Sequence, residues 1–178
     1  MKLKNETLSK NFLIYGFGKS GISSLKYLKK KNRCFIFDDD KKKIKNKYKK
    51  FFISKSKLLN NNFDYIVISP GININRCQLS NYLKKNQKKV ITDFDIFYKF
   101  NPEVLTITIT GTNGKSTTSK LLYDILKKHH YDTRLTGNIG NPILEEKRVT
   151  KNTIFVIEAS SYQLAYSKYF KSKFSIII

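Results

Sequence analysis

The segment between residues 104 and 126 constrains the fold more than any other part of this 178-residue chain. A β-branched run at residues 104–110 is followed at once by a glycine-bearing loop at residues 111–118. Apolar residues at helical spacing come next, at Leu121, Leu122, Ile125 and Leu126. A strand that passes through such a loop into a helix surrounds a phosphate with backbone N–H groups. The segment therefore predicts a parallel α/β unit that binds a nucleotide at the end of its first strand.

The side chains of this loop fit the phosphates of ATP. Lys115 would reach the β and γ phosphates, and the Ser116 hydroxyl would ligate Mg²⁺. The strict phosphate-loop pattern has glycine where this chain has Ile109, so the loop is a variant of that pattern. We predict that ATP is bound by Gly111, Thr112, Asn113, Gly114, Lys115, Ser116 and Thr117.

Glu158 ends a later apolar run at residues 153–157, where a phosphate-loop enzyme places a carboxylate for its metal. A solvated strand end is the other interpretation of this residue. We predict Lys115 and Glu158 as catalytic residues, and Ser116 and Glu158 as the ligands of Mg²⁺.

A second glycine loop lies near the N-terminus. Residues 16–21 read G-x-G-x-x-G, directly after the apolar run at residues 12–15 and before a helical pattern. Asp38 lies 20 residues beyond Gly18 and could accept a hydrogen bond from a ribose hydroxyl. NAD and another nucleotide diphosphate fit this pattern equally well, and simple packing of a strand on a helix is a further interpretation.

Two more apolar runs complete the first half of the chain. Residues 34–37 end in three aspartates, and residues 65–68 end in Ser69-Pro70-Gly71. Continuous apolar strands separated by helix-length segments are typical of a parallel sheet covered on both faces. We therefore predict an α/β fold with a Rossmann-like domain at residues 1–101, followed by the first part of a phosphate-loop ATPase domain at residues 102–178. The boundary is set by Asn101-Pro102-Glu103, because proline disfavours helix in the residue before it.

The charge of the chain is strongly positive. Its 35 Lys and Arg residues against 13 Asp and Glu residues give a formal net charge of +22. Almost all of this charge is lysine in a chain also rich in Asn, Ile and Phe, which indicates a compositional bias, so we expect no specific nucleic-acid partner. The densest run, residues 41–50, could be a nucleic-acid patch, but we interpret it as a solvated loop or helix face. The two cysteines form no metal-binding or disulfide pattern, and no signal or membrane-spanning segment is apparent, so we expect a cytoplasmic monomer without membrane insertion.

Five motifs in this order resemble the Mur ligases, the ATP-dependent amide-forming enzymes of peptidoglycan precursor synthesis. Two of these motifs are the glycine loops, and the other three are residues 69–72, 137–142 and 157–164. These last three look like the branch of the family that adds D-glutamate to UDP-N-acetylmuramoyl-L-alanine. The resemblance runs from about residue 12 to residue 178.

The resemblance implies that the first domain holds a UDP-linked substrate instead of NAD. Ser20 would lie near the diphosphate, and Asp38, Asp39, Ser69 and Gly71 would lie near the uridine and diphosphate. Asn138 would contact the substrate near its reacting end. The implied cofactors are ATP and Mg²⁺, and the implied substrates are UDP-N-acetylmuramoyl-L-alanine and D-glutamate.

The family's second metal site and its D-glutamate-binding domain are expected beyond Ile178. We therefore expect an N-terminal portion of a longer ligase that is inactive alone. The alternatives are another Mur-type ligase, an NAD-dependent oxidoreductase that uses the first glycine loop, and a basic nucleic-acid-binding NTPase fragment.

Overall fold

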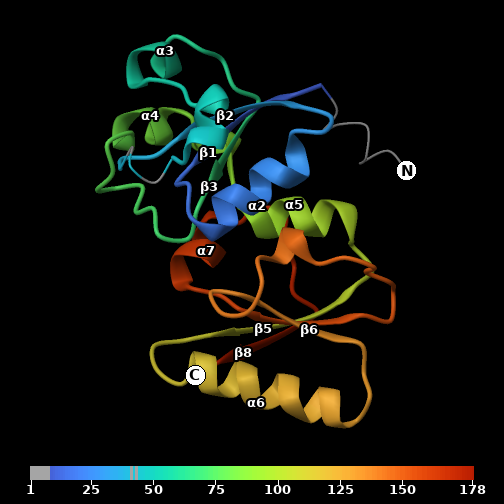
Figure 1. Cartoon of the computed structure of the whole chain (residues 1–178). Coiled ribbons are helices and arrows are strands. Elements are labelled where there is room, and N and C mark those ends of the chain that lie inside the picture. Colours follow the sequence, from blue (N-terminus) through green and yellow to red (C-terminus); the bar gives the residue numbers. More distant parts are fainter. Residues whose placement is uncertain (1–8, 41, 43) are drawn as a thin grey trace.

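Two parallel sheets, each with helices against it, form the computed structural model of the chain, which describes residues 9–40, 42 and 44–178 (Figure 1). The first sheet has the order β2-β1-β3-β4 and the second the order β6-β7-β5-β8, and every pairing between named strands is parallel. The predicted α/β class is confirmed. None of the described helices is both long and apolar enough to span a membrane.

The first sheet consists of β1 (Asn11–Tyr15), β2 (Arg33–Phe37), β3 (Tyr65–Ile68) and β4 (Val90–Ile91). Its strands read as continuous apolar runs because both faces are covered. Phe12 and Ile14 of β1 belong to one buried cluster, which includes residues of α2 (Lys19–Leu28) and α5 (Asp93–Phe100). Leu13 and Tyr15 belong to the cluster on the opposite face. That cluster includes residues of α3 (Lys55–Leu59) and α4 (Ser80–Lys85).

The second sheet consists of β5 (Leu105–Thr110), β6 (Thr133–Gly137), β7 (Ile154–Glu158) and β8 (Phe174–Ile177). Helix α6 (Lys115–Lys128) follows the phosphate loop, as predicted, and packs against β5, β6 and β7. Its apolar residues divide between two faces: Leu122 and Leu126 are half-buried, but Leu121 and Ile125 are 59% and 47% exposed. The short helices η4 (Ile143–Glu145) and α7 (Ser161–Tyr166) follow β6 and β7.

Helix α5 lies between the two sheets (Figure 1). Phe97 on this helix packs against Phe155 of β7 with ring centroids 4.6 Å apart, and Phe94 packs against Phe170 at 5.3 Å. Both contacts are within the range of favourable aromatic pairs. One buried cluster therefore runs from the first sheet through α5 into the second sheet.

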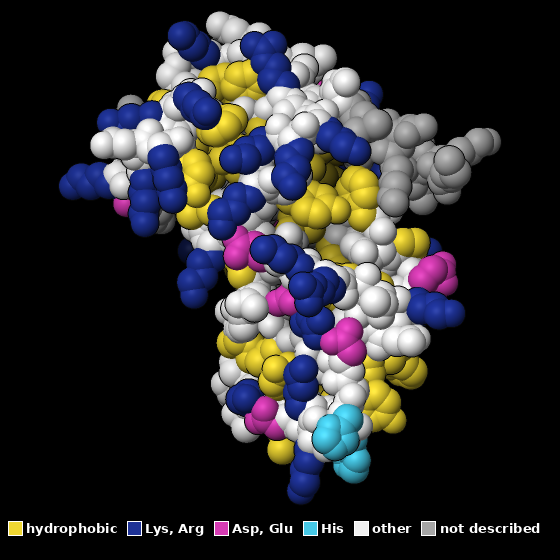
Figure 2. All heavy atoms as spheres, turned by 45° about the vertical axis from the view of Figure 1, so that its right-hand side comes forward, with side chains coloured by type: hydrophobic (Ala, Val, Ile, Leu, Met, Phe, Trp, Pro, Cys, Tyr) yellow, Lys and Arg dark blue, Asp and Glu magenta, His cyan; other side chains and the backbone are white. Residues whose placement is uncertain are grey.

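The described part of the lysine-rich run at residues 41–50 presents its charges to solvent. Lys41 and Lys43 lie outside the described residues. Most of the described run lies in the 3-10 helix η2 (Asn46–Phe51). A second 3-10 helix that contains lysines, η3 (Gln87–Lys89), follows α4. Ile44 and Tyr48 are buried while Lys47, Lys49 and Lys50 are exposed, so the described lysines of this run face solvent. Figure 2 shows Lys and Arg side chains scattered over one face of the molecule among uncharged surface.

Candidate active site

The N-terminal glycine loop brings α2 very close to β1. Gly16 adopts a positive φ of 89°, which an L side chain rarely adopts. A Cβ atom on Gly21 would lie 2.1 Å from the carbonyl oxygen of Gly16, so only glycine fits there. Gly18, in contrast, has no heavy atom within 4 Å of its Cβ position. The loop therefore leaves open space over the N-terminus of α2, where free backbone N–H groups favour an anion.

Asp38 holds this loop in place. Its side chain is 5% exposed and accepts hydrogen bonds from the backbone N–H of Phe17 at 2.6 Å and of Asp40 at 2.9 Å. Our sequence interpretation assigns this carboxylate to a ribose hydroxyl. In the structure both oxygens already bind the backbone, so a ligand would share them with the loop.

Asp39 extends the acidic end of the site and is fixed by two neighbours. One carboxylate oxygen accepts from the Tyr15 hydroxyl at 2.7 Å, and the other accepts from the Gln78 backbone N–H at 3.4 Å. Burial, followed by hydrogen bonds to Cys77 and Asp39, raises the pKa of Tyr15 well above its usual range. Tyr15 therefore stays protonated and acts as a donor to Asp39.

Ser69 closes the same loop from β3. Its hydroxyl donates to the Gly16 carbonyl at 2.6 Å, which leaves its oxygen lone pairs as acceptors. Sequence reasoning placed this residue and Gly71 at the C-terminal end of a strand, and the structure does the same.

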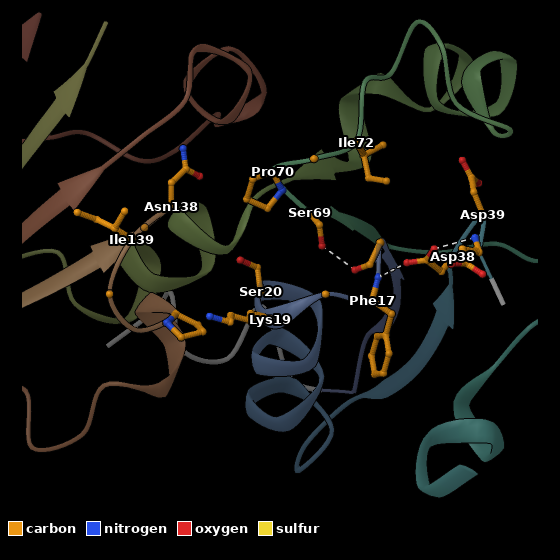
Figure 3. Close-up of a pocket in the computed structure, with 17 residues that line it drawn as sticks. Phe17, Lys19, Ser20, Asp38, Asp39, Ser69, Pro70, Ile72, Asn138 and Ile139 are labelled. Carbon is orange, nitrogen blue, oxygen red and sulfur yellow. Dashed lines mark hydrogen bonds between the residues drawn. The ribbon is translucent and has the colours of Figure 1, made fainter. Parts of the chain in front are cut away.

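A cavity of about 680 Å³ lies over these loops and has a second wall from the other sheet (Figure 3). Figure 3 shows Asp38 and Asp39 at one end, Asn138 and Ile139 at the other, and Ser20 and Ser69 between them. The second wall is the segment after β6, from Gly137 to Pro142. The structure thus brings all the residues predicted for the UDP-linked substrate to one cavity: Ser20, Asp38, Asp39, Ser69, Gly71 and Asn138.

Asp93 lies next to the candidate site, and the sequence did not reveal this. It begins α5, is 4% exposed, and interacts by a side-chain hydrogen bond with Ser20, which lines the cavity. Burial raises the pKa of the Asp93 carboxyl to about 6, although the bonds to Ser20 and to the Phe94 backbone lower it. An aspartate in the first turn of a helix is common and gave no signal that this side chain would meet the glycine loop.

The phosphate loop of the second sheet is tightly ordered. Lys115 donates from Nζ to the carbonyl oxygens of Gly111 at 2.8 Å and Thr112 at 3.0 Å. The Thr112 N–H donates to the Ile178 carbonyl at 3.1 Å, and a Cβ on Gly111 would lie 1.7 Å from that same oxygen. The loop therefore depends on the close approach of the chain just after β8.

Ser116 and Glu158, the predicted metal ligands, lie together. The Ser116 hydroxyl donates to Glu158 Oε2 at 2.7 Å, and the Glu158 residue is 4% exposed. Two adjacent oxygen ligands of an octahedral Mg²⁺, each about 2.1 Å from the ion, are about 3 Å apart. Mg²⁺ in phosphate-binding sites takes one or two carboxylates together with substrate phosphates. The donor set and spacing of Ser116 and Glu158 fit that ion.

Glu158 also connects the phosphate loop to the cavity. Its carbonyl oxygen accepts from the backbone N–H of Asn138 at 3.0 Å, while its carboxylate accepts from Ser116. A Cβ on Gly137 would lie 2.1 Å from the same carbonyl, so this approach also requires glycine. One residue at the end of β7 thus contacts both the Asn138 end of the cavity and the phosphate loop.

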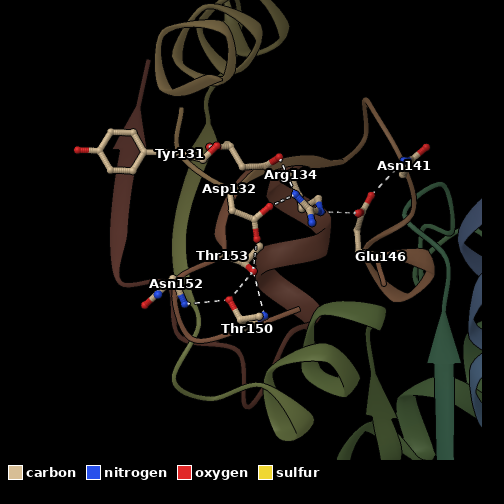
Figure 4. A network of polar contacts seen from close by, with 9 residues as sticks. Tyr131, Asp132, Arg134, Asn141, Glu146, Thr150, Asn152 and Thr153 are labelled. Carbon is tan, nitrogen blue, oxygen red and sulfur yellow. Dashed lines mark hydrogen bonds and ion pairs between the residues drawn. The ribbon is translucent and has the colours of Figure 1, made fainter. Parts of the chain in front are cut away.

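A polar network fixes the segment that forms the second wall (Figure 4). Arg134 of β6 pairs with Asp132 and, through Nε at 3.1 Å, with Glu146. Asn141 donates to Glu146 at 3.0 Å, and Thr153 donates to Asp132 at 2.6 Å. The Thr153 hydroxyl, followed by Arg134, lowers the pKa of Asp132. The network holds both ends of the loop between β6 and β7.

Together these features define a class of protein: a two-sheet α/β chain in which a strand–loop–helix unit of the phosphate-binding type lies beside a cavity lined from both sheets. Residues 109–178 match the family described as Mur ligase middle domain. This part of the chain is therefore similar to the Mur ligases.

Curated relatives extend this similarity to the N-terminal half. The UDP-N-acetylmuramoylalanine--D-glutamate ligase of Caldicellulosiruptor bescii is 35% identical over 182 residues, which covers 95% of this chain and 39% of the relative. The protein of the same name from Rickettsia bellii is 33% identical over 172 residues, covering 94% of this chain and 38% of the relative. The chain therefore spans about two fifths of the length of these relatives.

A solved structure shares the fold. The crystal structure of UDP-N-acetylmuramate:L-alanyl-gamma-D-glutamyl-meso-diaminopimelate ligase from Neisseria meningitides matches with a TM-score of 0.54 at 12% identity. The match covers 95% of this chain and 60% of that one.

Proposed function

We propose that this chain supplies the UDP-substrate cavity and part of the ATP site of a ligase that adds D-glutamate to UDP-N-acetylmuramoyl-L-alanine. Residues 1–101 would form the substrate domain and residues 102–178 part of the ATP-binding domain. The observation that carries the proposal is the position of Glu158, which contacts Asn138 at the cavity and Ser116 in the phosphate loop. The names of the relatives support the choice of substrates.

The order of groups along the cavity matches an elongated UDP-linked substrate. Asp39 would meet the uridine end, because it offers a carboxylate acceptor beyond the end of β2, and Ser69 at the end of β3 would lie between the uridine and the diphosphate. Ser20 and the backbone of the glycine loop would meet the diphosphate at the start of α2. Asn138 would then meet the acyl end, next to Glu158.

The phosphate loop would hold ATP with its γ phosphate toward that acyl end. Lys115 now donates to two loop carbonyls and would turn its ammonium group to the phosphates when ATP binds. Ser116 and Glu158 would hold Mg²⁺, which when bound neutralises charge on the transferring phosphoryl group.

The reaction would proceed in two steps on the substrate carboxylate. A carboxylate oxygen attacks the γ phosphorus of ATP, the bond to ADP breaks, and an acyl phosphate forms. The D-glutamate amine then attacks the acyl carbon, phosphate leaves, and the amine loses a proton as the amide forms. Lys115 would stabilise the charge that develops on the phosphoryl oxygens during the first step. We place this reaction in the cytoplasm, with the protein as a monomer.

Calorimetric titration of the chain tests the proposal without requiring turnover. We expect saturable binding of UDP-N-acetylmuramoyl-L-alanine and no binding of NADH at moderate salt. Mg-ATP should bind to the wild type and to Lys120→Ala, a matched control five residues further along α6. Lys115→Ala should lose Mg-ATP binding and keep the UDP-sugar. Binding of NADH in place of the UDP-sugar would overturn the assignment and make the glycine loop a dinucleotide site.

A further inference from the structure

The Asp95 carboxylate joins the two sheets of the structure. Asp95 lies on α5, is 1% exposed, and uses one oxygen to accept from three successive backbone N–H groups. These are the N–H groups of Lys168 at 2.8 Å, Tyr169 at 2.7 Å and Phe170 at 3.0 Å. The other oxygen accepts from the N–H and hydroxyl of Thr92, at 2.8 and 3.2 Å. The buried charge is thus compensated by donors from both units of the chain.

Further contacts follow the same line between the units. The hydroxyls of Thr92, just after β4, and Ser167, just after α7, are 2.7 Å apart. The Tyr166 hydroxyl at the end of α7 accepts from the backbone N–H of Ile74, in the loop after β3. The segment at residues 166–170 is therefore held by the first unit at several points.

This segment leads directly to the phosphate loop. After Phe170 the chain enters β8, which pairs with β5, and the Ile178 carbonyl then accepts from Thr112. In the other direction, α7 begins two residues after Ala159, which follows Glu158. Asp95 thus holds a segment that leads to Glu158 in one direction and to the phosphate loop in the other. Asp95 lies on α5, and the first residue of that helix, Asp93, interacts with Ser20 of the cavity.

We propose that Asp95 is a positioning residue that fixes the UDP cavity relative to the phosphate loop, so that one ligand can contact both walls at once. The inference rests on the proposed function. An amide side chain cannot replace this carboxylate, because both carboxylate oxygens accept hydrogen bonds and an amide has only one oxygen. An asparagine in its place would turn an NH₂ group toward either Thr92 or the N–H groups of residues 168–170.

The test compares a short ligand with a long one. UDP is expected to contact the first unit, whereas UDP-N-acetylmuramoyl-L-alanine would also reach Asn138. In Asp95→Asn we expect UDP and Mg-ATP affinities to stay near those of the wild type. The affinity for the long ligand should fall by about tenfold, as for loss of one good contact. Ser167→Ala removes the contact with Thr92 and a hydrogen bond to the Gln163 carbonyl within its own segment, but keeps the Asp95 contacts. It should shift the affinity for the long ligand in the same direction by a smaller factor. Asp124→Asn, on the exposed surface of α6, is the control.

A purely structural role would give a different result. Equal losses for UDP and for the long ligand, or no loss for either, would overturn the proposal. If the wild type binds neither UDP ligand, the proposed function fails, and hydrogen exchange then decides the role of Asp95. We expect Asp95→Asn to lose amide protection at residues 168–170 and 138–141 and to retain it in β1 and β5. Unchanged protection at those segments would reject the positioning role.

Discussion

Replacement of Gly21 by alanine is the sharpest test of the packing between α2 and the first sheet. The added Cβ would lie 2.1 Å from the Gly16 carbonyl oxygen, whereas a carbon and an oxygen approach no closer than about 3.3 Å in ordinary contacts. The helix would therefore have to move away from β1 by about 1 Å, the difference between the two distances. Leu25 and Leu28, which are 0% and 2% exposed on the same helix, would be pulled out of their contacts.

We expect the substitution to lower the free energy of unfolding by about 3 kcal/mol, at the upper end of the range for overpacked sites. For a domain of this size each kcal/mol corresponds to about 2–4 °C, so the melting temperature should fall by roughly 6–12 °C. Differential scanning calorimetry of the 178-residue chain measures this directly.

Gly18→Ala is the matched control in the same loop. Its backbone is extended, with φ of −80°, and its Cβ position is open, so the melting temperature should stay within about 2 °C of the wild type. The new methyl group would nevertheless occupy the cavity wall and weaken UDP binding. A Gly21→Ala protein that melts like the wild type, or a Gly18→Ala protein that is equally destabilised, would refute the reasoning.

Three further predictions concern the charged groups of the two sites. Lys115→Ala should weaken Mg-ATP binding by about 100-fold, because a charge-assisted contact to phosphate is lost, as measured by calorimetry against Lys120→Ala. Glu158→Gln should retain nucleotide binding but lose most of its enhancement by Mg²⁺, and a magnesium titration at fixed ATP that matches the wild type would contradict this. The raised pKa of Asp93, about 6, means that the folded protein holds a proton between about pH 4 and 6 that the unfolded chain releases. The stability associated with Asp93 is therefore lost as the pH rises through this window. In urea titrations, the free energy of unfolding of Asp93→Asn relative to the wild type should rise between pH 4 and pH 6, by about 3 kcal/mol at most. Above about pH 6 the difference should stay constant.

The strands with continuous apolar sequences could be predicted from the sequence. The runs at residues 12–15, 34–37 and 65–68 appear as β1, β2 and β3, and the helix after the phosphate loop begins at Lys115, as expected. Strand β6 was not predicted, because Thr133-Arg134-Leu135-Thr136 has only one apolar side chain. Its pairing with β7 and the ion pairs of Arg134 replace the missing apolar pattern.

The positions of the candidate residues could be predicted where they lie in loops at strand ends, and less so where side chains distant in sequence meet. Ser116 and Glu158 lie within hydrogen-bond distance, as the predicted shared metal requires. The spacing between Gly18 and Asp38 indicated a carboxylate at the right place, but spacing cannot distinguish a side chain that faces a ligand from one that holds the loop. Asp93 and Asp95 were missed because their partners are far away in sequence, at Ser20 and at residues 168–170.

The aromatic layer around α5 has a consequence for how the chain unfolds. Phe94 and Phe97 belong to a helix that follows the first sheet, yet their ring partners, Phe170 and Phe155, belong to the second unit. Neither sheet can lose its structure without exposing these rings to water, which couples the two units energetically. We therefore expect one cooperative thermal transition instead of two, with calorimetric and van't Hoff enthalpies in agreement. Cleavage of the chain near Pro102 should leave the two pieces associated, because the covalent link there contributes less than the buried contacts on either side of it.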